Sequence, residues 1–370
     1  MATLRGETVD RPAVSFYEIN GLDENPLDPD PYNVYNHPSW EPLIRLARDR
    51  TDRIVMRDVP FIEAPVNPIQ DITSTRTWNE NGSTYVRKTI QASDRILSQT
   101  TRRDPGVNTV WQVEHLLKNL EDLQAFLELP WPEPGGIPET SAVLKAEDEL
   151  GDSGIVMIDT ADPICASAAL FDLGTYTVLA STEPHWFGKL LDLYAKEIFF
   201  HTQAVANALP GRLWRIYGPE YASPPYLHPK YFREYVTFYD RQMVKMIQAK
   251  SGFARIHSHG RLRLILDDIR SMDCSGLDPI EPPPQGDVEL SFVRDKYGDQ
   301  MVLFGNLEAS DLENLDSGEF ETKIRRAIRE GTYGKGRGFV LMPSSCPYGR
   351  ELPERALKNY QKMIEVIENG

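Results

Sequence analysis

Two histidines and a cysteine are the residues whose types and positions best suit chemistry in this sequence. His257 and His259 lie at the end of FARIHSHG, a segment that begins with the short apolar run of a β-strand. Side chains two residues apart on a strand point to the same face, so the two imidazoles can converge on one point. Cys346 follows another apolar run, GFVLMP. Two imidazoles and a thiolate suit Zn²⁺, and three protein ligands leave a fourth position open for a substrate.

Polar residues end the other apolar runs as well. Asp159 ends GIVMID, while Glu220 and Tyr221 follow LWRIYG. We interpret these three residues as catalytic or substrate-orienting groups. Glu281 ends GLDPIE and is a candidate fourth ligand, or a partner that orients a ligand. Structural roles stay open at this point: Asp159 and Glu220 can cap the segments that follow them, and Cys346 can be a buried inert thiol.

The elements that must position these residues alternate between strand and helix. Strands are expected at 154–159, 213–218, 253–257, 276–281, 301–306 and 338–343, and helices near 184–208, 229–251, 261–272, 289–297, 318–330 and 353–368. Short apolar strands that alternate with amphipathic helices indicate a parallel sheet covered on both sides. With one or two more strands upstream, the pattern favours an α/β fold of the (β/α)8 TIM-barrel type. An open doubly wound sheet is the alternative, but no Gly-x-Gly-x-x-Gly follows an early strand.

The first 150 residues have a different pattern. Residues 1–36 are rich in Asp, Pro, Asn and Tyr and are expected to form an irregular arm that wraps the surface. A helix is expected at 39–49 and a strand at 53–57. Asn81-Gly82 between two β-rich runs is a strong hairpin signal, and a β-meander to about residue 103 should follow. We therefore expect an N-terminal arm, helix and β-meander over 1–150, packed on a barrel formed mainly by 151–370.

Composition excludes several classes of function. The chain has 370 residues and a net charge of −15, and no basic run that would bind nucleic acid. No apolar stretch has the length of a signal peptide core or a membrane span. The three cysteines are far apart, which indicates a reducing compartment and a cytoplasmic protein. The oligomeric state stays open, with a homodimer as one expectation.

The second part of the chain resembles the uroporphyrinogen decarboxylase superfamily. The resemblance covers roughly 154–370. It is carried by the run HSHGRLRLILDDIRSMDCSGLDPIEPPPQG, by the closing segment GFVLMPSSCPYGRELPERALKNYQKMIEVI, and by ADPICASAALFDLGTYTVLASTEPHWFGKLLDLY. It implies a TIM barrel and one of two chemistries. One branch decarboxylates the acetate side chains of uroporphyrinogen without a cofactor. The other branch comprises zinc-dependent methyltransferases that move a methyl group between a corrinoid protein and a small acceptor such as a thiol.

The resemblance is closer to the methyltransferase branch. Its zinc ligands are a His-x-Cys pair and a distant Cys, which match His257, His259 and Cys346, with His in place of the middle Cys. That exchange removes one thiolate charge and makes a bound metal more electrophilic. The arginine-rich motif and the Ser-Asp-Ile aspartate of the decarboxylases have no counterpart here. The resemblance thus implies a zinc-dependent methyltransferase acting with a corrinoid protein and a small-molecule methyl acceptor. The alternatives are a decarboxylase-type lyase and a non-catalytic corrinoid- or tetrapyrrole-binding protein.

Overall fold

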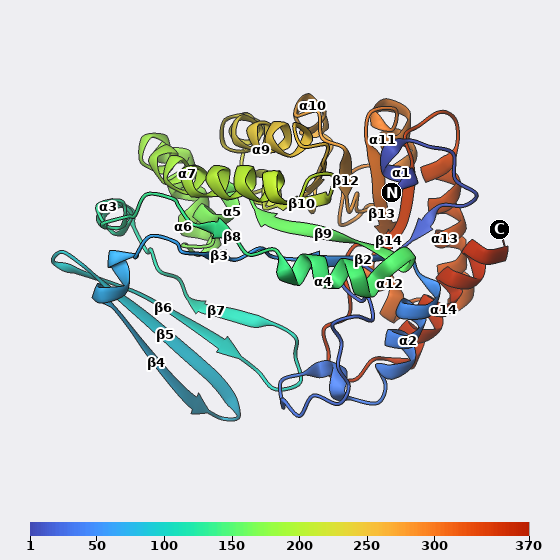
Figure 1. Ribbon diagram of the computed structural model, residues 1–370, viewed down its shortest axis with the longest axis horizontal. Coiled ribbons are helices and arrows are strands. Elements are labelled where there is room, and N and C mark those ends of the chain that lie inside the picture. The colour runs from blue at the N-terminus through green and yellow to red at the C-terminus, as the bar shows by residue number, and fades with distance from the viewer. Residues whose placement is uncertain (370) are drawn as a thin grey trace.

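Eight parallel strands form a barrel at the centre of the computed structural model, which describes residues 1–369 (Figure 1). The order around the barrel is β1-β14-β13-β12-β11-β10-β9-β2. The strands are β1 (Ala13–Val14), β2 (Arg53–Arg57), β9 (Gly154–Ala161), β10 (Leu213–Tyr217), β11 (Phe253–His257), β12 (Gly276–Asp278), β13 (Val302–Leu307) and β14 (Phe339–Pro343). The predicted TIM barrel is confirmed.

Asp52 closes the barrel between its first and last strands in that order. Its backbone N–H donates to the carbonyl of Val14 at 2.7 Å, and its carboxylate accepts from the Val14 N–H at 2.9 Å. Arg11 pairs with the same carboxylate at 2.7 Å. One residue, through its backbone and its side chain, thus supplies the hydrogen bonds of a ladder that β1, with two residues, is too short to form.

Helices cover the outside of the barrel and bury a large apolar layer against it. A smaller apolar cluster fills the inside and includes Met157, Leu213 and Phe304. The helices are α1 (Ala2–Arg5), α2 (Glu41–Arg50), α3 (Leu120–Leu127), α4 (Ser141–Leu150), α5 (Pro163–Ala168), α6 (Leu173–Thr182), α7 (Pro184–Ala208), α8 (Pro229–Phe232), α9 (Phe238–Gln248), α10 (Leu266–Ser271), α11 (Leu290–Tyr297), α12 (Ala309–Asn314), α13 (Ser317–Thr332) and α14 (Glu354–Asn369). Within residues 1–369, no helix combines the length and apolar character that a bilayer crossing needs.

Three expectations are corrected. The segment 1–36 is not only a surface arm, because it supplies β1 and buries Val14, Phe16 and Ile19 almost completely. The strand expected at 276–281 ends at Asp278, since Pro279 has no N–H with which to continue a ladder. The helix expected from 261 begins only at Leu266.

A four-stranded antiparallel sheet lies beside the barrel, in the order β4-β5-β6-β7 (Figure 1). Its strands are β4 (Thr73–Glu80), β5 (Ser83–Ala92), β6 (Arg95–Arg103) and β7 (Val110–Glu114), and a small pair of β3 (Phe61–Ile62) and β8 (Ile137–Pro138) lies near it. The predicted hairpin at Asn81-Gly82 is confirmed, with both residues at positive φ. At the β6–β7 turn, the Asn108 N–H donates to the carbonyl of Tyr348 at 2.9 Å. The sheet is thereby tied to the loop that follows β14.

Glu114 joins the last two strands of this sheet. Its carboxylate accepts from the hydroxyls of Ser98 at 2.6 Å and Thr100 at 2.7 Å, and lies 3.3 Å from the Lys118 ammonium. Partial burial alone would raise the pKa of Glu114, but these hydrogen bonds outweigh it and lower the pKa to about 2.

We expect Glu114→Gln to lower the free energy of unfolding by about 1–2 kcal/mol at pH 6. The depressed pKa favours folding above the unfolded value of about 4.3, and this gain is lost as the pH falls toward 2. Urea unfolding at several pH values should therefore show the difference between the two proteins shrinking from pH 5 to about pH 2. A difference that stays constant over this range would show that the charge of Glu114 has no part in it.

Candidate functional site

The inside of the barrel carries a layer of charged side chains just below the C-terminal ends of its strands. Arg215 on β10 and Arg255 on β11 stand directly opposite each other in register, and both are buried. The Arg215 guanidinium donates to both carboxylate oxygens of Asp159, at 2.6 and 2.9 Å. The Nε atom of Arg255 lies 2.9 Å from Oδ1 of Asp278, in an ionic contact without hydrogen-bond geometry. Two cations and two anions thus balance one another inside the barrel.

The two predicted histidines lie together above this layer. Nδ1 of His257 is 2.7 Å from Oδ2 of Asp278, and Nδ1 of His259 is 2.9 Å from Oε1 of Glu281. The second oxygen of Glu281 accepts from the backbone N–H of Gly260 at 2.6 Å. The two imidazole rings are perpendicular, with centroids 4.7 Å apart. We infer that each Nδ1 carries the hydrogen, because a carboxylate accepts, and that each Nε2 carries a lone pair.

The carboxylates beside these histidines remain anionic despite burial. Burial alone would raise the pKa of Asp278, but the charge of Arg255 and the hydrogen bond from His257 lower it. For Glu281, burial is likewise outweighed by the hydrogen bond with His259, and its pKa falls. Burial alone would lower the pKa of His259, but the hydrogen bond with Glu281 raises it. Each histidine is therefore held by a charged acceptor, which fixes the ring orientation.

Tyr17, from the segment that follows β1, completes the charged layer. Its hydroxyl accepts a hydrogen bond of 2.8 Å from Arg215, and its ring lies 6.2 Å from that of His257 between centroids. Burial raises the pKa of Tyr17 well above its usual range, so the hydroxyl stays neutral. The N-terminal segment thus contributes directly to the candidate site.

Cys346 contacts the N-terminal segment. Its Sγ is 3.5 Å from Oε2 of Glu18, and its side chain packs against the large apolar cluster. Burial, followed by the charge of Glu18, raises the pKa of the Cys346 thiol. The thiol thus points toward the N-terminal segment, in a setting that favours its neutral form.

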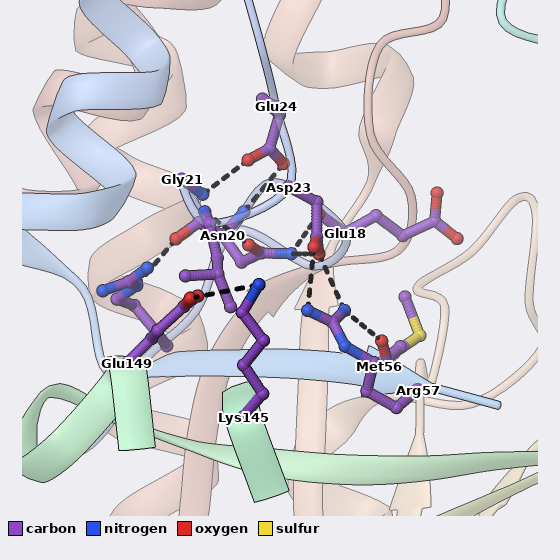
Figure 2. A network of polar contacts seen from close by, with 11 residues as sticks. Glu18, Asn20, Gly21, Asp23, Glu24, Met56, Arg57, Lys145 and Glu149 are labelled. Atoms are coloured by element: carbon purple, nitrogen blue, oxygen red, sulfur yellow. Dashed lines mark hydrogen bonds and ion pairs between the residues drawn. The ribbon is translucent and has the colours of Figure 1, made fainter. Parts of the chain in front are cut away.

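A polar network holds the loop that carries Glu18 (Figure 2). The Glu18 carbonyl accepts from the Asn20 amide at 3.2 Å, while the Glu24 carboxylate accepts from the backbone N–H of Gly21 at 2.7 Å. Asp23 pairs with Arg57 of β2 at 2.8 Å. The Glu18 side chain itself points away from this network (Figure 2). The network therefore fixes the backbone and leaves the Glu18 carboxylate free to meet Cys346.

The three residues predicted to be catalytic have different contacts. Both carboxylate oxygens of Asp159 are engaged by Arg215. Glu220 lies near two other buried acids, and its charge raises the pKa of both Asp162 and Asp240 in addition to the larger effect of burial. The ring of Tyr221 stands edge-on to another tyrosine, and burial raises its pKa to about 12. Their catalytic roles stay predictions.

Gly218 directly follows β10 and allows the end of that strand to lie close to α5. A Cβ at this glycine would lie 2.3 Å from Oδ1 of Asp162 and 2.3 Å from Cβ of Cys165, and its φ is +122°. Asp162 caps α5 through a 2.7 Å hydrogen bond from the Cys165 N–H. Only glycine allows this approach, which places Glu220 beside the buried acids.

The histidine pair suits a metal ion in one respect. Metal-ligating histidines commonly hold Nδ1 on a carboxylate and present Nε2, as His257 and His259 can do here. Within the described part of the chain, no group of three or more His, Cys, Asp or Glu side chains is placed to hold a metal ion. Zinc ligation by His257, His259, Cys346 and Glu281 stays a prediction.

Comparison with known proteins places the chain in a family. The family model described as uroporphyrinogen decarboxylase (URO-D) matches residues 182–369, which is half of the chain. The chain belongs to the uroporphyrinogen decarboxylase family. Among the 36 solved chains that match is a methyltransferase from Methanosarcina mazei, with 13% identity and a TM-score of 0.60. The similarity covers 100% of this chain and 96% of that one, and shows the shared fold. No curated protein matches the sequence.

Four residues of the charged layer inside the barrel were not predicted from the sequence: Tyr17, Arg215, Arg255 and Asp278. A signal for two of them was present. LWRIY and FARIH each carry one arginine at the third position of an otherwise apolar run, and these arginines pair in register. A charge at an equal position in two neighbouring barrel strands indicates a polar layer inside the barrel.

Proposed function

We propose that this member of the uroporphyrinogen decarboxylase family is a metal-dependent methyltransferase that transfers a methyl group to a small acceptor. The observation that carries the proposal is the pair of imidazoles, His257 and His259, each fixed through Nδ1 by a carboxylate. The methyltransferase from Methanosarcina mazei, which has the same fold, supports the choice of reaction. His257 and His259 would hold a zinc ion, which would supply Lewis acidity that lowers the pKa of a bound acceptor.

The protein's own groups prepare these imidazoles. Asp278 and Glu281 fix the ring orientations, and Arg255 keeps Asp278 anionic. Below them, the hydrogen-bonded trio of Arg215, Asp159 and Tyr17 fills the barrel. The proposed site is therefore rigid on its inner side and bounded there by groups whose charges are already neutralised.

Two further parts of the proposal concern the third ligand and the donor. Cys346 would serve as third ligand only after giving up its contact with Glu18. The methyl donor would be a corrinoid carried by a partner protein.

Uroporphyrinogen decarboxylation is less well supported, because a substrate with many carboxylates needs free guanidinium groups, and Arg215 and Arg255 are both paired with aspartates.

The test supplies both possible substrates to the purified protein. With methylcobalamin as donor and 2-mercaptoethanesulfonate as acceptor, we expect loss of the methylcobalamin absorbance and formation of the methyl thioether. With uroporphyrinogen III in a parallel assay, we expect no CO₂ above that of a protein-free control. Release of CO₂ without any methyl transfer would overturn the proposal in favour of the decarboxylase.

A further inference from the structure

The strand β4 forms a long free edge of the antiparallel sheet. It pairs along its full length with β5, and its other side has no strand beside it within residues 1–369. Most of its residues are exposed, and it is the outermost strand of the sheet, away from the barrel (Figure 1). An open edge of eight residues is a template for pairing with another strand.

The tight turn at Asn81-Gly82 determines which backbone groups point to that edge. In a two-residue hairpin the flanking residues, here Glu80 and Ser83, exchange hydrogen bonds with each other. Bonded and non-bonded pairs then alternate along an antiparallel ladder. The N–H and C=O groups of Thr75, Thr77 and Asn79 therefore point outward from β4.

The side chains of β4 add a charge pattern to this edge. Arg76, Trp78 and Glu80 alternate along the strand and so share one face. Trp78 stacks on Tyr85 of β5, with centroids 5.2 Å apart and planes 9° apart, and the Arg76 guanidinium lies 5.6 Å from the Trp78 ring. Both Arg76 and Glu80 are exposed, and neither takes part in an ion pair within the described chain.

We propose that two copies of this chain associate by antiparallel pairing of their β4 strands, with Trp78 opposite Trp78 of the second copy. In this register Thr77 of each copy faces Asn79 of the other, which matches the outward-pointing backbone groups. Arg76 of each copy then faces Glu80 of the other, in both directions, as a twofold interface requires. The edge is self-complementary in hydrogen bonds and in charge.

Other registers that fit the same backbone pattern are less favourable. With Arg76 opposite Arg76, like charges meet, which destabilises a pair of strands. With Thr77 opposite Thr77, Arg76 faces Trp78 and Glu80 faces Ser74, so neither charge meets its opposite. The chain carries a net charge of −15, so two copies repel each other over most of their surfaces. Opposite charges that meet on β4 offset this repulsion locally.

The interface is small, so the dimer should be weak. Pairing of one short strand, with two aromatic rings, buries less than the ~1,200 Å² of a standard interface. We therefore expect dissociation constants in the range of about 10–100 μM, as for transient complexes. Sedimentation equilibrium from low to high micromolar concentration should show the mass rising from 42.1 kDa toward twice that value.

Charge exchange on β4 tests the register. Arg76→Glu and Glu80→Arg should each weaken association by about tenfold or more, because each places like charges opposite one another. The double variant R76E/E80R should restore association, since the pairs are then reversed. Lys88→Glu is the matched control: Lys88 is exposed, has no ion pair within the described chain, and lies on the other face of the sheet. It changes the net charge by the same amount as Arg76→Glu and should leave association almost as in the unchanged chain.

A backbone variant tests the edge itself. Thr77→Pro removes an N–H that points outward, so the sheet of a single copy should tolerate it while the dimer is lost. Circular dichroism and the urea midpoint confirm folding of each variant. A chain that stays monomeric at every concentration would overturn the proposal. So would an association that Thr77→Pro and the two single charge changes leave unaltered, since it would then use another surface.

Discussion

Asp278→Asn is expected to lower the free energy of unfolding by about 3–5 kcal/mol, the largest effect on stability that we expect from a single polar substitution here. Asp278 is fully buried and is the counter-ion of Arg255, whose side chain is 2% exposed. Asparagine keeps the size of the side chain but removes its charge. The Arg255 cation would then lie inside the barrel without its paired anion, and His257 would lose its charged acceptor.

Two comparisons make this expectation specific. The double variant R255M/D278N removes both charges and should recover most of the lost stability, because a neutral pair has no desolvation cost left uncompensated. Asp23→Asn breaks the exposed pair with Arg57 and should cost less than about 1 kcal/mol. Urea unfolding gives all three values. A loss below about 1 kcal/mol for Asp278→Asn would show that the buried ion pair is not a stabilising contact.

His257→Ala is expected to reduce the rate of methyl transfer by about 10³-fold, because one of the two proposed histidine ligands is lost. The protein should remain folded, since Asp278 keeps its ion pair with Arg255. The measurement is the rate of methylcobalamin loss under saturating thiol. His185→Ala is the control, because His185 is an exposed residue of α7. Equal rates for the two variants would show that His257 has no part in methyl transfer.

Most of the barrel was predictable because its strands are short, apolar and regularly separated by helices. The first strand was not, because two residues, Ala13 and Val14, carry too little pattern to stand out in a segment rich in Pro and Asp. Only the closed barrel shows that this segment fills a gap, with Asp52 supplying the hydrogen bonds. Tyr17 was missed for the same reason.

The candidate site was predicted in part, and the limits have physical causes. The histidines were found because residues two apart on a strand share a face, and the structure brings His257 and His259 together. Cys346 lies three residues beyond the end of β14, where no ladder fixes the direction of its side chain. Its contact with Glu18 joins residues 328 positions apart, which no local pattern reveals.

The zinc content of the purified protein tests the central claim most directly. Protein prepared without chelators is measured by mass spectrometry of its metals, beside the double variant H257A/H259A and the control His185→Ala. We predict about one zinc ion per chain in the unchanged protein and in the control, and less than a tenth of that in the double variant. Full methyl transfer by metal-free protein, or equal zinc in the double variant, would contradict the account.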